Sequence, residues 1–494
     1  MLKANQVMHR YDVLHRVPSV VVSCGLATIL NLLPTPPGTS HAEAGEFRIP
    51  AGQRQLFLDD YGTAEVENLH RTMHQPNKRG ALIRSPNREQ TIQTRTAPVW
   101  DPQAKHYKLW VLGIDQNLWQ SQDGQNWTPG PKTNMRIDMA VYDPRESDPS
   151  RRFKAPLLND GFAVSADGAL WTKIDVQEIQ SSDEGNFSYD AEGGLFIHTV
   201  KRGGNHGRSV ALATSRDFRT WTDSGLVFQA DDSDQQLGKQ HIEARMADAT
   251  LQQSLYNDPK AYNADVYNMG VFRYEGLYVG LPAMYHATGP VPNYPNTDGF
   301  HLVELVCSRD LKDLSRLGGR QAFIGPSRLN SGAYDLTQIL PPSAPVVRDD
   351  ELWFYYTGLK WRDTFTYVGE YPRGEHVPIP GRNRDVGAVC LAVLRRDGFV
   401  SLDAGENEGS VLTQPFTLAA GKLYVNVDAH GGELSAEVCD NQGKVLARSE
   451  VVKTDLSQVE LRWEHGELVE LKQQTVNVRF KLRNASLYSY WLAD

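Results

Sequence analysis

The chain has 494 residues, more than one compact core organises, so two or three domains are expected. Its hydrophobic fraction of 40% and charged fraction of 22% are ordinary for a globular protein. The net charge of −9 becomes −10 when residues 1–44, with three basic and two acidic side chains, are set aside. An acidic surface argues against nucleic acid as a partner.

The first 44 residues have the order of a secretory signal peptide. Three basic residues precede an apolar run over 17–33, and a small-x-small triplet at 42–44 precedes Gly45. The run is too short and too broken to span a membrane securely. We therefore expect a secreted or periplasmic protein. A lipobox-like stretch ending in Cys24 leaves a lipid anchor as one alternative, and an uncleaved leader is another.

The first strand expected after the leader is Gln55–Leu58, which runs into Asp59 and Asp60. It lies in a segment from Gly45 to about Arg88 that precedes a series of repeats. In ring-shaped repeat folds the N-terminal strand often completes the last repeat. We expect Gln55–Leu58 to close the ring in this way.

Five short hairpins recur over residues 89–402, and most are followed by a serine–aspartate turn. The hairpins begin at Trp100, Tyr142, Tyr189, Phe272 and Val347. The clearest turns contain Asp123, Asp167 and Asp217, and weaker copies contain Asp310 and Asp397. Each unit reads as a four-stranded sheet, which buries both of its faces only by stacking on copies of itself. The repeats predict an all-β fold with a five-bladed β-propeller.

Two intervals between repeats are about twice as long as the others. The extra length falls between Asp223 and Ala264 and between Gly358 and Asp385. Both inserts are polar and rich in turn-forming residues, so we expect long loops rather than further blades. Such loops commonly lie over one mouth of a propeller channel, where ligands bind.

The sequence changes character after about Ala404. Apolar and polar residues alternate in three stretches, at Leu423–Val427, Leu434–Val438 and Val476–Leu482. This period of two predicts a small antiparallel β-sandwich over 405–494, following a propeller over 45–404. Its expected role is structural, and independent sugar binding is the alternative.

Acidic residues stand at the expected starts of four inner strands of the propeller. They are Asp138, Asp183 with Glu184, Asp265 and Asp335. Strand starts converge on one mouth of the channel, and converging carboxylates suit glycosidic cleavage, in which one carboxyl donates a proton and another stays ionised. The alternative is that each aspartate only caps a turn. The first repeat offers Arg95 instead of an acid, and Asp59 or Asp60 could fill that gap.

Two further acids are candidates outside the strand starts. Glu243 lies in the first long insert, beside Arg245, and Glu304 lies within an apolar strand. Both could be ordinary surface or edge charges. Glu243 is the better functional candidate because it is expected on a loop.

Several other site types lack support in the sequence. Cys307, Cys390 and Cys439 have no CxxC spacing and read as small buried side chains, with one disulfide possible. The histidines have no metal-ligand spacing, and no phosphate-binding glycine loop or Gly-x-Ser-x-Gly turn is present. No cofactor is expected, although a structural Ca²⁺ in the channel remains possible, since oxygen ligands need no fixed spacing.

Several motifs resemble a known group of proteins. They are Leu56-Phe57-Leu58-Asp59-Asp60-Tyr61, His74-Gln75-Pro76, Tyr267-Asn268-Met269, Leu352-Trp353-Phe354-Tyr355-Tyr356, Arg396-Asp397-Gly398-Phe399-Val400-Ser401 and Val478-Arg479-Phe480-Lys481-Leu482. The chain resembles exported glycosyl-hydrolase-like proteins of planctomycetes and related bacteria. These are similar to the five-bladed propeller hydrolases that include invertases, fructanases and arabinosidases. The resemblance implies the fold more strongly than the reaction.

The arabinosidase-like enzymes use an Asp base, a second Asp that tunes and orients, and a Glu acid. The resemblance implies Asp60 or Asp138 as the base, Asp183 or Asp265 as the tuning residue, and Glu243 or Glu184 as the acid. Substrate binding would fall to Arg95, Arg245, Asp335 and Tyr267. The chain departs from the family pattern, because its first repeat lacks an inner-strand Asp and the invertase motif Asn-Asp-Pro-Asn is absent.

The leading functional hypothesis is an exported glycoside hydrolase that cleaves a plant or algal oligosaccharide or polysaccharide with paired carboxylates. The alternative is a carbohydrate-binding propeller that has lost the chemistry, because a fold does not certify an activity. A sialidase-like enzyme ranks last, since it would need six blades, a cluster of channel arginines and a tyrosine nucleophile.

Overall fold

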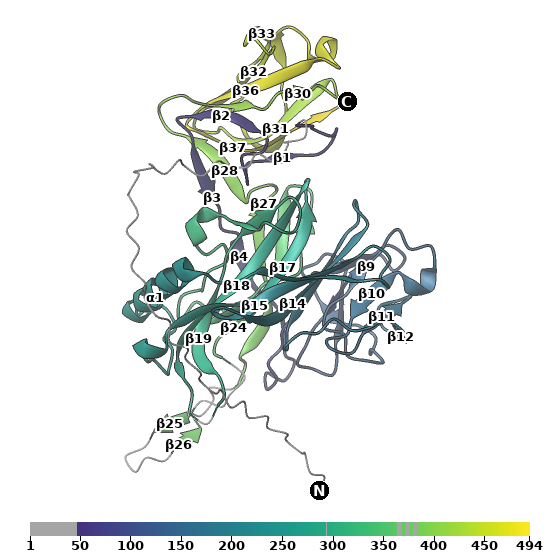
Figure 1. The fold of residues 1–494 in the computed structure, drawn as a ribbon, viewed down its shortest axis with the longest axis vertical. Helices are drawn as coiled ribbons and strands as arrows, with labels where there is room; N and C mark the ends of the chain where they lie inside the picture. Colours follow the sequence, from purple (N-terminus) through teal and green to yellow (C-terminus); the bar gives the residue numbers. More distant parts are fainter. Residues whose placement is uncertain (1–46, 293, 363–367, 371–375, 379–383) are drawn as a thin grey trace, which may run out of the picture. The chain divides into compact units, whose positions relative to one another are not determined.

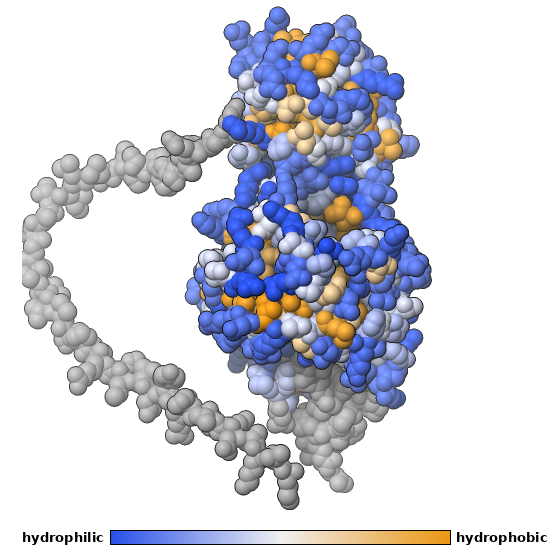
Figure 2. Space-filling model, turned by 90° about the vertical axis from the view of Figure 1, so that its right-hand side faces the viewer, coloured by the Kyte–Doolittle hydropathy of each residue, from blue (hydrophilic) through white to orange (hydrophobic). Residues whose placement is uncertain are grey.

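The computed structural model describes residues 47–494 apart from 293, 363–367, 371–375 and 379–383. The predicted signal peptide and Cys24 lie outside the described residues. The described chain is mostly β-structure, with α1 (Asp232–Ala247) as its one α-helix (Figure 1). Among these residues, no helix combines the length and apolar character needed to cross a bilayer. The face of the molecule in Figure 2 is largely hydrophilic, with separate hydrophobic patches.

The first three repeats form three four-stranded antiparallel sheets. The first contains β5 (Val99–Asp101), β6 (His106–Trp110), β7 (Leu118–Ser121) and β8 (Thr128–Pro129). The second contains β9 (Val141–Tyr142), β10 (Phe153–Pro156), β11 (Phe162–Ser165) and β12 (Trp171–Ile174). The third contains β13 (Gly185–Asp190), β14 (Leu195–Gly204), β15 (Gly207–Ser215) and β16 (Thr222–Phe228). In each sheet the strands follow one another in sequence order, as the repeats predict.

Two larger sheets follow. One contains β17 (Asn263–Tyr274), β18 (Leu277–Pro290), β20 (Val306–Ser308) and β21 (Ser315–Arg316), with β19 (Thr297–Val303) also paired to β18. The other contains β22 (Gln338–Leu340), β24 (Glu351–Leu359), β27 (Gly387–Arg395) and β4 (Asn77–Arg84), with β23 (Val346–Val347) paired to β24. The first strands β5, β9, β13 and β17 contact one another in that order.

The strand that joins the last of these sheets from the N-terminal side is β4, not Gln55–Leu58. β4 pairs with β27 through six residue pairs, whereas β1 (Gln55–Leu56) pairs with β37 (Ala485–Ala493). The expectation for Gln55–Leu58 was therefore wrong. Two register shifts interrupt the pairing of β4 with β27, so β4 lacks the regular alternation that marks a strand in sequence.

The C-terminal strands form two antiparallel sheets together with N-terminal strands. One sheet contains β1, β3 (His70–Met73), β28 (Val400–Ala404), β31 (Lys422–Asp428), β34 (Asp455–Glu460) and β37. The other contains β2 (Thr63–Glu67), β29 (Gly409–Thr413), β30 (Phe416–Thr417), β32 (Glu433–Cys439), β33 (Val445–Ser449), β35 (Trp463–His465) and β36 (Thr475–Arg483). Residues 55–73 thus pair with strands beyond residue 400.

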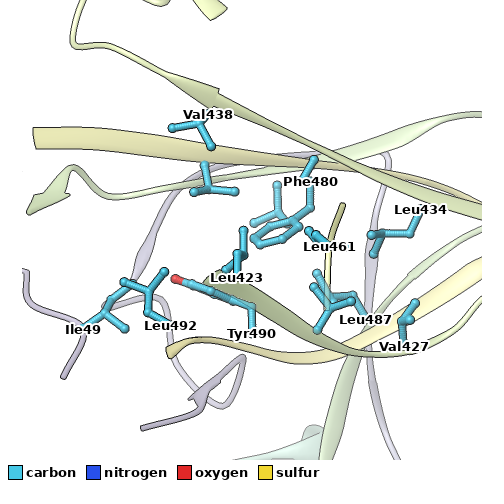
Figure 3. Close-up of a cluster of buried hydrophobic side chains, with 14 of the residues drawn as sticks. Ile49, Leu423, Val427, Leu434, Val438, Leu461, Phe480, Leu487, Tyr490 and Leu492 are labelled. Atoms are coloured by element: carbon cyan, nitrogen blue, oxygen red, sulfur yellow. The ribbon is translucent and has the colours of Figure 1, made fainter. Parts of the chain in front are cut away.

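A single hydrophobic core fills the space between these two sheets. Leu423 and Val427 from β31 face Leu434 and Phe480 of the other sheet, and Tyr490 from β37 packs among them (Figure 3). All five side chains are buried. The predicted alternation of apolar and polar residues therefore corresponds to side chains that point into and out of this core.

The two inserts are not simple loops. The first contains the 16-residue helix α1, whose N-terminus is closed by a capping box between Asp231 and Asp234. Only four helix residues are buried, so the helix has almost no apolar stripe to reveal it in sequence. The second insert contains the hairpin of β25 (Val368–Glu370) and β26 (His376–Pro378), and its other residues lie partly outside the described chain.

Candidate functional site

A cavity of about 300 Å³ opens where three adjacent first strands begin. Its wall contains Gln93 and Arg95 before β5, Asp138 before β9, and Asp183 with Glu184 before β13. Because β5, β9 and β13 contact one another in order, residues at their starts meet at one place. We call this space the charged cavity. It unites four of the residues that the sequence singled out.

Arg95 and Glu184 form a buried bidentate ion pair across the charged cavity. Arg95 Nε lies 2.5 Å and Nη2 lies 2.7 Å from the two carboxylate oxygens of Glu184. Their side chains are only 7% and 10% exposed. Burial alone would raise the pKa of Glu184, but Arg95, Lys201 and a hydrogen bond from Tyr267 together lower it below its usual value. Glu184 is therefore an ionised carboxylate.

Lys201 and Tyr267 support this ion pair from the neighbouring strands. Lys201 Nζ on β14 lies 2.5 Å from a carboxylate oxygen of Asp183 and 3.7 Å from the centre of the Tyr267 ring. Tyr267 lies at a β-bulge of β17, between Val266 and Asn268, whose partners are consecutive residues of β18. A bulge changes the direction of a side chain. Here it brings the tyrosine hydroxyl within hydrogen-bonding reach of Glu184.

Asp138 faces the same cavity but is held much more loosely. It accepts hydrogen bonds from Arg136 Nε at 2.6 Å and Nη2 at 3.1 Å. Arg136 is 74% exposed, whereas the Asp138 side chain is 15% exposed. An ion pair with a solvent-exposed partner contributes little free energy. Arg136 can therefore move aside and leave Asp138 facing the cavity.

Asp138 also lines a second cavity of about 420 Å³. This neighbouring space shares Arg136, Asp138 and Leu158 with the charged cavity and continues past Lys173. Asp138 thus lies where the two spaces meet. A linear molecule that occupied both would pass directly over this carboxylate.

Asp265 lies beside the cluster on β17 and is joined to it through Arg208. Arg208 Nε lies 2.9 Å and 3.0 Å from the two oxygens of Asp265, and its guanidinium packs over the rings of Tyr267 and Tyr285. Burial raises the pKa of Asp265 above its usual value, although Arg208 opposes that shift. His301 packs on the same two rings, and burial first, then nearby cations, lower its pKa well below its usual value.

Asp335 lies apart from the charged cavity. It forms a salt bridge with Lys78 Nζ at 2.6 Å and accepts a hydrogen bond from the Tyr356 hydroxyl at 2.9 Å. Lys78 and Tyr356, which contact the Asp335 carboxylate, both belong to the sheet that β4 joins. These contacts give Asp335 a structural role in that sheet.

Three other predicted residues are not part of the cluster. Asp60 is 80% exposed and pairs with Arg71, next to β2 and β3. Glu243 lies on α1 rather than a loop, is 57% exposed and pairs with Lys239. Arg245 is buried, where its guanidinium donates to the backbone carbonyls of Gln252 and Leu336. Because both residues lie on α1, Glu243 points to solvent and Arg245 points into the protein. The sequence predicts a loop here and therefore does not predict this difference.

The sequence analysis missed Arg136, Lys201 and Arg208. Lys201 follows the buried stretch Phe196–Val200, which contains His198 and Thr199, so no apolar run marks this lysine in the sequence. Glu304, which the sequence did single out, is buried and pairs with Arg316 at 3.0 Å, away from this site.

In the described chain, no group of three or more His, Cys, Asp or Glu side chains is arranged to hold a metal ion. A structural Ca²⁺ therefore stays a prediction. Cys307, Cys390 and Cys439 are buried and free, as their spacing predicted, and the possible disulfide is not formed.

No protein-family model matches the chain, and no curated protein matches it. Solved structures that align with it include an N-acetylgalactosamine deacetylase from F. plautii in complex with blood group B trisaccharide (14% identity, 67% of this chain and 97% of that one, TM-score 0.36). Others are the Bombyx mori GH32 β-fructofuranosidase BmSUC1 (9%, 83% and 95%, 0.34) and a glycoside hydrolase family 32 protein from Bifidobacterium adolescentis (10%, 85% and 82%, 0.33). All three TM-scores are below 0.5, and we derive neither reaction nor substrate from them.

Proposed function

We propose that the protein is a glycoside hydrolase and that the charged cavity is its active site. The observation that supports this most directly is that Asp138 and Glu184, from adjacent first strands, line one cavity while their surroundings treat them differently. Hydrolysis of a glycosidic bond needs two carboxyl groups with different protonation behaviour. One wall of the cavity supplies a buried carboxylate held by Arg95, and the other supplies a carboxylate whose ion-pair partner is exposed to solvent.

In this proposal Glu184 is the charged partner of the developing positive charge on the sugar. Arg95, Lys201 and the Tyr267 hydroxyl keep it ionised and fix its position. After its exposed partner Arg136 has moved away, Asp138 takes up a proton from solvent and gives it to the leaving oxygen. A water molecule then adds to the sugar carbon and returns a proton to Asp138. The two cavities that meet at Asp138 would hold the sugars on either side of the bond that breaks.

The five sheets would then form a five-bladed propeller, with the first strands around its channel and β4 completing the last blade. The sandwich would consist of residues 47–73 together with 400–494, a division supported by the pairing of β1, β2 and β3. The substrate would be an oligosaccharide or polysaccharide of plants or algae, as the motifs suggest.

One observation favours the alternative, a carbohydrate-binding protein without catalysis. Arg95 occupies the first-repeat position where related hydrolases place an acid, and it already neutralises Glu184. Such a protein would keep the cavity and its affinity for sugars. The two functions therefore differ in turnover and not in binding.

The test is release of reducing ends from plant and marine oligosaccharides and polysaccharides. Asp138→Asn and Glu184→Gln should each lower the rate at least a hundredfold, because each removes one half of the carboxylate pair. Glu243→Gln is the matched control: it changes an exposed carboxylate on α1 and should leave the rate unchanged. Retained glycan binding without turnover in the unchanged protein would establish the binding function instead.

The same assay addresses the cofactor. We propose that the reaction uses none, so activity should survive dialysis against EDTA.

Export is proposed from residues 1–44, which lie outside the described chain. N-terminal sequencing of protein from the periplasm or medium should then begin at Gly45.

A further inference from the structure

A third cavity, of about 550 Å³, lies at the other end of the first strands. Its wall includes Trp100 from β5, Tyr142 from β9, Tyr189 from β13, and Phe272 and Arg273 from β17. We call it the aromatic cavity. Gly185, in the wall of the charged cavity, and Tyr189 are four residue steps apart on β13, which corresponds to about 13 Å along the strand. The two cavities are therefore distinct.

The sequence repeat itself builds this cavity. In the first three sheets the residue before the hairpin turn is aromatic and packs on an aromatic residue of the next strand. The pairs are Trp100 with Tyr107 at 4.9 Å, Tyr142 with Phe153 at 5.2 Å, and Tyr189 with Phe196 at 4.4 Å between ring centres. In the fourth sheet Arg273 takes this position, with its guanidinium 5.0 Å from the centre of the Tyr278 ring.

In each pair the aromatic residue of the second strand supports the ring that lines the cavity. Part of the surface of the lining ring stays open to the cavity. Trp100 is 42% exposed, among the most exposed large hydrophobic side chains of the described chain. Trp100 therefore offers part of its indole face to the cavity. Its rigid support means that little side-chain entropy is lost when a ligand binds.

The chemistry of the wall selects the kind of ligand. Among the described residues that line it, there is no Leu, Ile or Met, and Arg273 is the only charged side chain. Arg273 Nε is buried and has no hydrogen-bond partner in the described chain. Flat aromatic surface with a few fixed donors suits a ligand that has both a C–H face and hydroxyl groups. A cation would be repelled, and a purely aliphatic chain would leave Arg273 without a partner.

We propose that the aromatic cavity is a second carbohydrate site, which binds an uncharged pyranose chain by stacking on Trp100 and accepting hydrogen bonds from Arg273. The choice of a carbohydrate over other amphipathic ligands rests on the proposed function. The site holds a polysaccharide at the end of the first strands that is remote from the charged cavity.

The experiment titrates xylohexaose and cellohexaose into the full chain carrying Asp138→Asn, so that no hydrolysis consumes the probe, with isothermal titration calorimetry as the readout. Trp100→Ala should weaken binding of at least one hexaose tenfold or more. Trp100→Phe should restore most of it, because a flat ring returns. Tyr61→Ala is the matched control, since Tyr61 is 41% exposed but lies outside the cavity.

Unchanged affinity in Trp100→Ala, or no binding of either hexaose, would overturn the proposal. Neither result affects the hydrolase proposal, which depends on the rates of Asp138→Asn and Glu184→Gln. Conversely, if those variants still release reducing ends, the active-site assignment fails while the titration of the Trp100 variants remains decisive for the aromatic cavity.

Discussion

Arg95 and Glu184 hold each other in their charged forms inside the protein. Each side chain is too buried to be solvated, so the ionised state of each depends on the other. The pair thus stabilises the fold only while it is complete. This dependence explains how a carboxylate in a buried cavity can remain ionised.

Replacing Arg95 by Met should lower the free energy of unfolding by about 3–5 kcal/mol at pH 7, because Glu184 is left charged and unpaired. In the variant the pKa of Glu184 should rise, so the destabilisation should shrink as the pH falls and this carboxyl is protonated. Urea unfolding between pH 5 and 8 measures this. A difference that does not change with pH would contradict it, and Arg95→Met combined with Glu184→Gln should recover part of the loss.

The positions of Asp138, Asp183, Glu184 and Arg95 were predictable because a strand start is a local feature of the sequence. The partners of these residues were not. Arg136, Lys201 and Arg208 meet the acids through a turn, a neighbouring strand and a different sheet, and no local pattern reports those distances. The errors at Glu243 and Arg245 have another cause, since a helix with little apolar surface looks like a loop in sequence.

Salt bridges connect the start of helix α1 to the fourth sheet and to the segment that follows it. Arg316 bridges Asp234 at the helix start and Glu304 next to β19, and Arg320 bridges Asp231 and Asp234. Burial raises the pKa of Glu304 to about 7, against the lowering effect of Arg316 and helped by Asp234. The strand–helix junction therefore contains a carboxyl that titrates near neutral pH.

Because the pKa of Glu304 is higher in the folded chain than the usual 4.5, the stability it contributes is complete below about pH 4.5 and is lost as the pH rises through 7. Relative to Glu304→Gln, the wild-type protein should lose about 3 kcal/mol across this range. Urea denaturation of both proteins at pH 4.5, 6 and 7.5 tests it. A constant difference would show that Glu304 does not titrate in this window.

The sheets themselves were largely predictable from the turns. Asp123, Asp167 and Asp217 accept hydrogen bonds from backbone N–H groups two and three residues further on, which is the local chemistry that the repeats indicated. The pairing of β4 with β27 was not predictable in this way. The partner of β4 lies in a different part of the sequence, and the bulges in β4 remove the alternation that would have marked it.

One buried aspartate connects the distant parts of the molecule. Asp397, whose side chain is fully buried, accepts hydrogen bonds from Arg54 in the N-terminal segment, Tyr274 at the end of β17, and Ser489 in β37, each at 2.6 Å. The Arg396-Asp397-Gly398 turn, which resembles a weak repeat, thus joins the fourth sheet to the sheet containing β37.

Asp397→Asn should lower the free energy of unfolding by about 3 kcal/mol or more, because Arg54 then loses its buried counterion. Asp313→Asn, an exposed aspartate, is the control and should change stability by less than about 0.5 kcal/mol. Chemical denaturation followed by tryptophan fluorescence compares the two. Equal midpoints for both variants would mean that Asp397 does not link these regions energetically.

The pairing of β4 with β27 has a consequence for biosynthesis. β4 leaves the ribosome roughly 300 residues before its partner, so at about 5–20 residues per second it waits about 15–60 s. β1 waits longer still for β37. Throughout this time their backbone groups form an open edge that other chains could join. The described sheets can be completed only after β27 and β37 have been translated, and until then the edges of β1 and β4 have no partner strand.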